Sequence, residues 1–240
     1  MSAPTTTPAR TPARTVLRAQ GLTRVFGTGA GEVHALTDAS LEVAAGELLV
    51  VRGPSGSGKT TLLNLLGGLD RPTAGSVWLG DAELTALGER DVLAARRDRI
   101  GYVFQSFGLV PVLSAAENVE VPLRLRRTAP AERARRVAEA LDAVGLGGHA
   151  RQRPYELSGG QQQRVGIARA LVADPEVLLA DEPTGQLDSG TAAVVMDLLA
   201  RVVHERGVAA VVSTHDPELM ARADRVLELR DGTVVDRGNG

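Results

Sequence analysis

The sequence predicts an α/β protein whose mainly parallel sheet is covered by helices on both faces. Short apolar runs suited to buried strands alternate with segments of helical periodicity, and this alternation is typical of parallel strands joined by helical crossovers. The predicted buried strands are residues 47–51, 100–104, 177–180 and 208–213. The helical patterns lie at 60–66 and at about 114–126, 131–144, 159–172 and 190–205.

The N-terminal part of the chain departs from this pattern. Residues 1–14 are mostly Pro, Thr, Ala and Arg, which cannot bury enough apolar surface to order themselves, so we expect a flexible tail. Between residues 16 and 51, apolar alternations are separated by glycine-rich turns, which predicts antiparallel strands. The predicted folded domain is therefore 15–236, with a second tail at 237–240.

Length and composition limit the possible functions. A chain of 240 residues fits one domain with a full core rather than two independent domains. A net charge of −2 without a basic stripe disfavours binding to DNA or RNA. The absence of cysteine excludes disulfides and thiolate chemistry. We find neither a signal peptide nor an apolar run of about 20 residues, so we expect a cytoplasmic protein without its own membrane span.

The basic residues are divided unevenly between arginine and lysine. Of the 27 basic residues, Lys59 is the single lysine. Drift in codon usage could leave one lysine by chance. A functional explanation is that an ammonium group is a compact charge that fits between phosphate oxygens, whereas a guanidinium is a planar fork. The position of Lys59 within a glycine-rich loop favours the functional explanation.

That loop lies between a predicted strand and a predicted helix and fits the phosphate-loop pattern G-x-x-x-x-G-K-[ST]. Glycines let successive N–H groups point inward, and the following helix adds the positive end of its dipole. Lys59 then reaches the terminal phosphates, and the Thr60 hydroxyl is placed to bind Mg²⁺. A Gly/Ser linker with a chance lysine is the alternative. The predicted phosphate-binding residues are Gly53, Pro54, Ser55, Gly56, Ser57, Gly58, Lys59, Thr60 and Thr61.

Two carboxylates follow the predicted strand at 177–180. Asp181 lies at the carboxyl end of a buried strand, where open parallel sheets bind ligands, and it suits Mg²⁺ directly or through water. Glu182 comes one residue later, points in a different direction and suits the water that attacks the phosphate. In isolation, an ordinary Asp-Glu surface turn is the better explanation of the pair. The upstream phosphate loop favours a catalytic pair.

A second anion site is predicted at the start of the helix at 159–172. Ser158 is suited to cap this helix, and Gly159, Gly160 and Gln161 then present backbone donors at its positive end. A capped helix that begins with glycine for packing reasons is the alternative. Physical arguments alone do not separate the two explanations.

Residues 157–164, LSGGQQQR, resemble the signature motif of the ATP-binding cassette family, and they lie between the phosphate loop and the Asp-Glu strand in that family's order. Further landmarks of the family have counterparts here. Gln105 resembles the glutamine loop, Leu187-Asp188 the dimer-facing loop, His215 the switch histidine and Phe26 the aromatic residue that stacks on adenine, where tyrosine is more familiar.

One branch of the family is especially similar. Residues 101–111, GYVFQSFGLVP, followed by Glu117-Asn118-Val119 and Pro122-Leu123, resemble the ATPases of lipoprotein-release and macrolide-export systems. That branch typically has Asn where this chain has Gln186. The substitution keeps an amide and adds one methylene, so it bears on communication across a dimer rather than on the nucleotide chemistry.

The resemblance implies a P-loop NTPase core with an antiparallel β edge subdomain and a helical subdomain at about 106–157. It implies hydrolysis of ATP with Mg²⁺, in which Lys59 and the loop backbone stabilise the phosphates. Glu182 then acts as base or orienter of the water. Gln105 and His215 sense the γ-phosphate and the water, and Gln105 joins Thr60 and Asp181 at the metal.

The resemblance also implies partners. In this family the nucleotide closes a head-to-tail homodimer, so Ser158 and Gly160 of one copy would cap ATP held by the other. Separate permease subunits would take up the motion through a groove near Gln105 and Phe107, at the cytoplasmic face of the membrane. An alternative is an ATPase that regulates a non-transporting cell-wall or division permease. A soluble cassette ATPase acting on DNA or ribosomes is less consistent, because such proteins usually carry tandem cassettes or long coiled-coil insertions.

Overall fold

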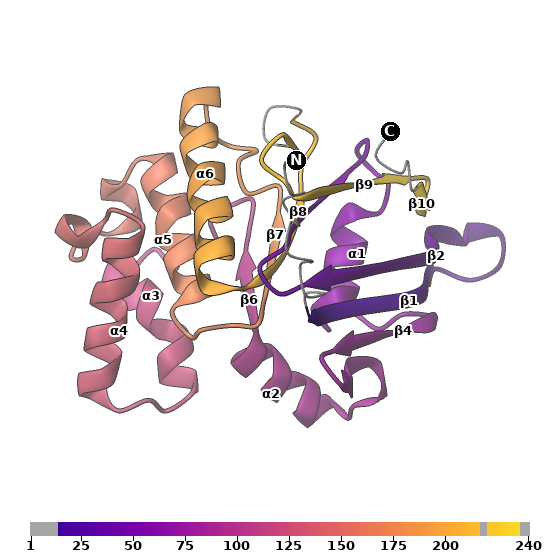
Figure 1. The fold of residues 1–240 in the computed structure, drawn as a ribbon, viewed down its shortest axis with the longest axis horizontal. Coiled ribbons are helices and arrows are strands. Elements are labelled where there is room, and N and C mark those ends of the chain that lie inside the picture. Colours follow the sequence, from indigo (N-terminus) through magenta and orange to yellow (C-terminus); the bar gives the residue numbers. More distant parts are fainter. Residues whose placement is uncertain (1–13, 217–219, 236–240) are drawn as a thin grey trace, which may run out of the picture.

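The computed structural model describes residues 14–216 and 220–235. Its central sheet has six strands in the order β10-β9-β3-β8-β7-β6, and neighbouring strands are parallel except that β10 runs antiparallel to β9 (Figure 1). This confirms the predicted α/β class with a mainly parallel sheet. The strands are β3 (Leu48–Arg52), β6 (Ile100–Val103), β7 (Val177–Asp181), β8 (Ala209–Ser213), β9 (Arg225–Arg230) and β10 (Thr233–Val235).

A second, antiparallel sheet has the order β2-β1-β4-β5 and confirms the expected antiparallel edge. Its strands are β1 (Thr15–Phe26), β2 (Val33–Ala44), β4 (Ala74–Leu79) and β5 (Ala82–Glu83). The two sheets meet where the amide of Thr37 in β2 donates to the carbonyl of Gly232, beside β10, at 2.8 Å. Helix α1 (Lys59–Leu66) packs between the sheets and contacts both.

The α-helices that follow α1 are α2 (Glu89–Arg99), α3 (Ala115–Leu125), α4 (Pro130–Ala143), α5 (Gly159–Leu171) and α6 (Ser189–Arg206). Of these, α3, α4 and α5 lie on the side of the parallel sheet opposite the antiparallel sheet (Figure 1). Local sequence explains several helix starts: Ser114 and Ser158 form capping boxes at α3 and α5, and Asp188 accepts a hydrogen bond from the Thr191 amide at α6. None of the helices in the described ranges has the length and apolar character needed to span a bilayer.

Strand β3 is apolar on both faces because each face belongs to a different core. Leu49 and Val51 pack with α1 and the antiparallel sheet, whereas Leu48 and Val50 pack with the helices on the other side. The segment 106–157, the proposed helical subdomain, contains α3 and α4 and contributes to the second of these cores through residues such as Val119 and Leu141.

Several elements were not predicted. Helix α2 has no buried residue, so it carries no apolar stripe to detect. Strands β4, β5, β9 and β10 were also missed. The predicted tails lie outside the described residues except for Arg14, whose carbonyl accepts a hydrogen bond from the Ala45 amide at 2.9 Å.

Candidate functional site

The phosphate loop joins the carboxyl end of β3 to the first residue of α1, as the sequence predicted. Gly58 has φ = 101°, which an L side chain rarely adopts, and a Cβ there would collide with the carbonyl of Ala35. A Cβ on Gly53 would collide with the carbonyl of Leu229. The glycines therefore allow neighbouring strands to approach the loop closely, while the loop keeps its N–H groups at the positive end of α1.

The Lys59 side chain folds back across this loop and is only 9% exposed. Its ammonium donates to the carbonyl of Gly53 at 2.8 Å and to that of Pro54 at 3.1 Å. Its Nζ atom also lies 3.7 Å from Oε1 of Glu182. The single lysine of the chain therefore lies between the phosphate loop and Glu182, the predicted catalytic carboxylate.

Thr60 and Asp181 are brought together from opposite halves of the chain. The Thr60 hydroxyl donates to Oδ2 of Asp181 at 2.8 Å, and the Ser213 hydroxyl donates to Oδ1 at 2.6 Å. Ser213 Oγ also accepts the amide of Glu182 at 2.8 Å. Sequence analysis missed Ser213, although a polar residue that ends an apolar strand was an available signal. Its role depends on the register of β7 and β8, which places Ser213 opposite Asp181.

The oxygen atoms of Thr60 and Asp181 suit Mg²⁺ only if a phosphate helps to complete the coordination shell of the cation. A hydroxyl and a carboxylate oxygen 2.8 Å apart suit this cation. Among the described residues there is no group of three or more His, Cys, Asp or Glu side chains that could hold a metal by itself. Mg²⁺ typically uses one or two carboxylates and completes its shell with water and substrate phosphates. Thr60 and Asp181 therefore match a cation that arrives with a nucleotide.

Glu182 and His215 form the second half of the site. Nδ1 of His215 lies 3.0 Å from Oε2 of Glu182. The glutamate side chain is 16% exposed, whereas the imidazole is 73% exposed. Glu182 also has φ = 44°, a left-handed conformation that directs its side chain differently from that of Asp181. The carboxylate thus faces the lysine on one side and a solvent-accessible histidine on the other.

These groups line one cleft of about 460 Å³, a volume in the range of small-molecule sites. Gln105 borders the same cleft next to Gly185. Three residues of β2, Val33, His34 and Ala35, form a wall that the sequence did not predict, since it depends on how the antiparallel sheet packs. The lining residues that were predicted are Ser55, Gly56, Gly58, Lys59, Thr60, Thr61, Gln105, Asp181, Glu182 and His215.

Three groups of predicted residues lie apart from that lining: Gly53, Pro54 and Ser57 of the phosphate loop, Phe26, and residues 158–161. Phe26 ends β1, is 41% exposed and pairs across the sheet with Val33 of the cleft wall. Ser158 accepts the amide of Gln161 at 3.3 Å, and the Gln161 side chain accepts the amide of Ser158 at 2.9 Å. No residue of 158–161 lines the cleft around Lys59. The predicted second anion site is therefore separate from the phosphate loop within one chain.

A smaller groove of about 200 Å³ lies between α2, β6, α3 and α5. Among the residues that the structure describes, the charged lining residues are all arginines, and the apolar lining includes the exposed Phe104 and Leu125. Arg169 donates to the carbonyls of Phe107 and Gly108 in the loop after Gln105, and burial lowers the pKa of its guanidinium. The full lining is Arg96, Arg97, Ile100, Gly101, Tyr102, Phe104, Pro122, Leu125, Arg169, Ala170 and Ala173.

Comparison with known proteins identifies the family of this chain. A family model described as "ABC transporter" matches residues 36–185. The chain is 46% identical over 211 residues to an uncharacterized ABC transporter ATP-binding protein of Thermotoga maritima, covering 88% of this chain and 90% of that protein. It is 45% identical over 228 residues to the lipoprotein-releasing system ATP-binding protein LolD of Chromohalobacter salexigens. That alignment covers 95% of this chain and 96% of LolD. It is also 45% identical to the macrolide export ATP-binding/permease protein MacB of Hyphomonas neptunium, but spans only 35% of that protein.

Solved structures show the same fold. The dimeric structure of MJ0796, a bacterial ABC transporter cassette, matches with a TM-score of 0.84 and 41% identity over 93% of this chain and all of that chain. A post-hydrolysis state of MJ0796 with ADP and phosphate matches with the same TM-score and 40% identity. The family model covers well over half of this chain and full-length relatives agree with it, so the chain belongs to the ATP-binding cassette family of transporter ATPases.

Proposed function

We propose that this chain is the ATP-hydrolysing motor of a membrane complex, in which nucleotide-driven pairing of two copies moves separate permease subunits. The observation that carries the proposal is the convergence of Lys59, Thr60, Asp181, Glu182 and His215 on one cleft. Phosphoryl transfer to water depends mainly on positioning and on charge stabilisation, and these five side chains supply both.

Each residue has a distinct role in the proposed reaction. Lys59 leaves the Gly53 and Pro54 carbonyls and binds the terminal phosphates, while Thr60 and Asp181 hold Mg²⁺, which supplies further neutralisation of phosphate charge when bound. Glu182 orients the attacking water and accepts its proton. His215 contacts the exposed side of Glu182.

Two further residues complete the proposed site. Gln105 enters from the loop after β6, where an amide can contact both Mg²⁺ and the water. Phe26 stacks on adenine at the edge of the cleft.

A second copy completes the second anion site. Ser158 is exposed at the start of α5, and no residue of 158–161 lines the cleft of the same chain. In the proposed head-to-tail dimer, Ser158 and Gly160 of one copy contact the γ-phosphate held by Lys59 of the other. The dimeric form of the MJ0796 cassette supports this arrangement. Hydrolysis removes the γ-phosphate that joins the two surfaces, and the dimer opens.

The arginine-lined groove is the proposed contact with the permease at the cytoplasmic face of the membrane. Its partly exposed apolar residues suit a segment of another protein. Arg169 links the groove to the loop that follows Gln105, so movement in the groove reaches the cleft through hydrogen bonds to Phe107 and Gly108. The MacB relative is named as an ATP-binding and permease protein in one chain, and the present chain matches only about a third of it.

The test is reconstitution with the permease encoded beside this chain. We expect the two proteins to purify together and ATP turnover to rise several-fold in lipid nanodiscs relative to the chain alone. The matched control is the same complex with Glu182→Gln, which should assemble and hydrolyse no ATP. Unchanged turnover together with a failure to co-purify contradicts the motor proposal. Stimulated turnover without movement of any cargo supports the alternative of a regulated, non-transporting permease.

A further inference from the structure

A stacked pair of side chains lies at the end of β1 that borders the cleft. The guanidinium carbon of Arg24 is 4.4 Å from the centroid of the Phe26 ring. A guanidinium at this distance over an aromatic face makes a cation–π contact and shields that face from water. One face of the Phe26 ring is therefore covered by Arg24.

Arg24 is itself held in place by Asp70, which follows the end of α1. Nε of Arg24 donates to Oδ2 of Asp70 at 2.8 Å, and Nη2 donates to Oδ1 at 3.0 Å. Asp70 Oδ1 also accepts the backbone amide of Arg71 at 2.8 Å. A bidentate pair fixes the plane of a guanidinium as well as its position. Arg24 is thus a fixed support behind the ring.

Phe26 lies next to the wall of the cleft. Phe26 is 41% exposed, and its direct partner across β1 and β2 is Val33. Directly paired residues carry their side chains on the same face of a sheet, so the ring stands beside Val33, which lines the cleft. An aromatic ring in this position offers a flat surface on which a base can stack.

Phenylalanine has no polar atom, so no hydrogen bond can fix the orientation of its ring. Packing of Arg24 against the ring is a contact that can do so. We propose that Arg24 and Asp70 are positioning residues for the adenine base, because they hold the Phe26 ring in the orientation in which it stacks. This inference rests on the proposed stacking of adenine on Phe26 and adds the two side chains that support the stacking ring.

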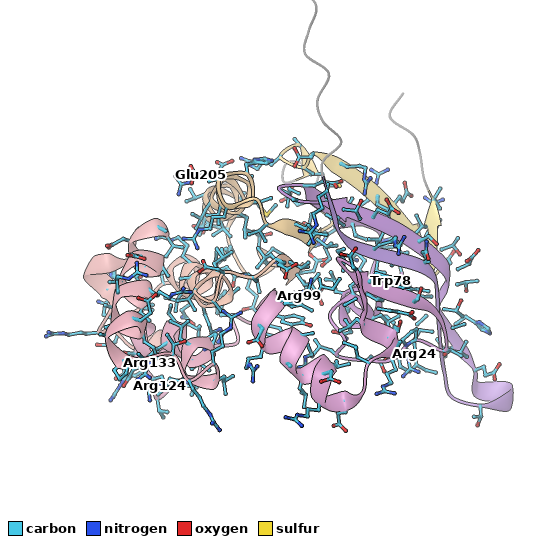
Figure 2. The ribbon with its side chains drawn as sticks, turned by 60° about the horizontal axis from the view of Figure 1, so that its bottom comes forward. Arg24, Trp78, Arg99, Arg124, Arg133 and Glu205 are labelled. Carbon is cyan, nitrogen blue, oxygen red and sulfur yellow. The ribbon has the colours of Figure 1, made fainter. Side chains whose placement is uncertain are left out.

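The experiment measures binding of two probes to the full-length chain by titration calorimetry. ADP carries the base and requires neither hydrolysis nor a second copy, whereas inorganic tripolyphosphate lacks the base. The variants are Arg24→Met, Phe26→Leu and the double variant. The matched control is Arg18→Met, because the guanidinium carbon of Arg18 lies 5.0 Å from the centroid of the Trp78 ring and neither residue lines the cleft. This variant therefore loses the same kind of contact at another place on the antiparallel sheet; Figure 2 labels both Trp78 and Arg24.

We expect Arg24→Met to raise the Kd for ADP about two- to fivefold, which is the size of a partly exposed cation–π contact. Phe26→Leu should raise it about tenfold through loss of stacking. The double variant should bind ADP no more weakly than Phe26→Leu, because Arg24 acts through the ring. Affinity for tripolyphosphate should stay the same in all variants, and Arg18→Met should bind both probes as the wild type does. Arg24→Lys should restore part of the ADP affinity.

The outcomes separate this inference from the stacking proposal beneath it. If Phe26→Leu binds ADP normally, adenine does not stack on this ring and both ideas are wrong. If Phe26→Leu weakens ADP binding while Arg24→Met does not, only the positioning role is wrong. Losses that multiply in the double variant, or a loss of tripolyphosphate affinity in Arg24→Met, also contradict it. None of these outcomes bears on coupling to a permease.

Discussion

Replacing Ser213 with alanine tests whether the buried hydroxyl that joins Asp181 to the backbone of Glu182 organises the site. Ser213 is fully buried and donates to Asp181, and its oxygen accepts the amide of Glu182. The Glu182 amide also donates to the Ser213 carbonyl at 3.2 Å, so the variant loses chiefly the bond to the carboxylate. A hydrogen bond to a charged group contributes about 1.5 to 3 kcal/mol.

We therefore expect Ser213→Ala to lower the free energy of unfolding by about 2 to 3 kcal/mol. For a chain of this length, that corresponds to a fall in Tm of about 4 to 12 °C. We also expect ATP turnover by the folded variant to fall, because mutation of a residue that orients a metal ligand typically lowers metal affinity or activity by about 10- to 100-fold. The measurements are denaturant unfolding and steady-state ATP turnover at a temperature where the variant is folded.

Val212→Ala is the matched control for this experiment. Val212 is equally buried on the same strand, and the loss of its methyl groups should cost about 2 to 3 kcal/mol without touching either carboxylate. We expect Val212→Ala to keep near-normal kcat/KM while folded. If Ser213→Ala retains the same kcat/KM as Val212→Ala, the hydroxyl does not organise the site and the reasoning is refuted.

The other predictions concern the cleft and the surface charges. Lys59→Ala should weaken ATP binding and abolish hydrolysis, since it removes the ammonium placed among the phosphates, and near-normal turnover would end the phosphate-loop interpretation. Glu182→Gln should bind MgATP and lose turnover, and surviving turnover contradicts its role in orienting the water. Chelation of Mg²⁺ by EDTA should abolish turnover of the wild type, and surviving turnover contradicts the need for this cation. Hydrogen bonds from Arg99 lower the pKa of Glu176, so their stabilisation is present above the ordinary pKa of 4.5 and is lost as pH falls below it. Tm measured from pH 6 to pH 3 should fall less steeply in Arg99→Met, and equal slopes would show that the pair has no such effect.

The sequence identified those parts of the site whose chemistry is local. The phosphate loop directly follows β3, Asp181 is the last residue of β7 and Glu182 comes next, so their spacing from buried strands was enough to predict where they lie. Ser213 could not be assigned because its role arises from the pairing of β7 with β8, which no local pattern encodes. The wall formed by Val33, His34 and Ala35 depends in the same way on packing between two sheets.

The fold shows the same limit. The short strands β3, β7 and β8 were predicted within a few residues because they bury nearly continuous apolar runs, and several helices were predicted because they bury a periodic set of side chains. Helix α2 was missed because none of its residues is buried. Strand β9 buries Leu229 alone among its residues, and β5 and β10 bury none. Elements that bury few side chains show little apolar pattern, and they are the ones that sequence analysis did not find.

The central claim is that each ATP is shared between two copies, and mixing two inactive variants tests it most directly. Lys59→Ala removes the phosphate ammonium, and Ser158→Arg blocks the start of α5; each is expected to be inactive alone. In a mixed head-to-tail dimer one site carries both changes and the other carries neither, so random pairing leaves roughly a quarter of all sites intact. We predict that mixing restores ATP turnover to about that fraction, with ATP-dependent dimerisation of Glu182→Gln followed by light scattering in parallel. No recovery on mixing, together with a monomeric Glu182→Gln in saturating MgATP, would contradict the shared site.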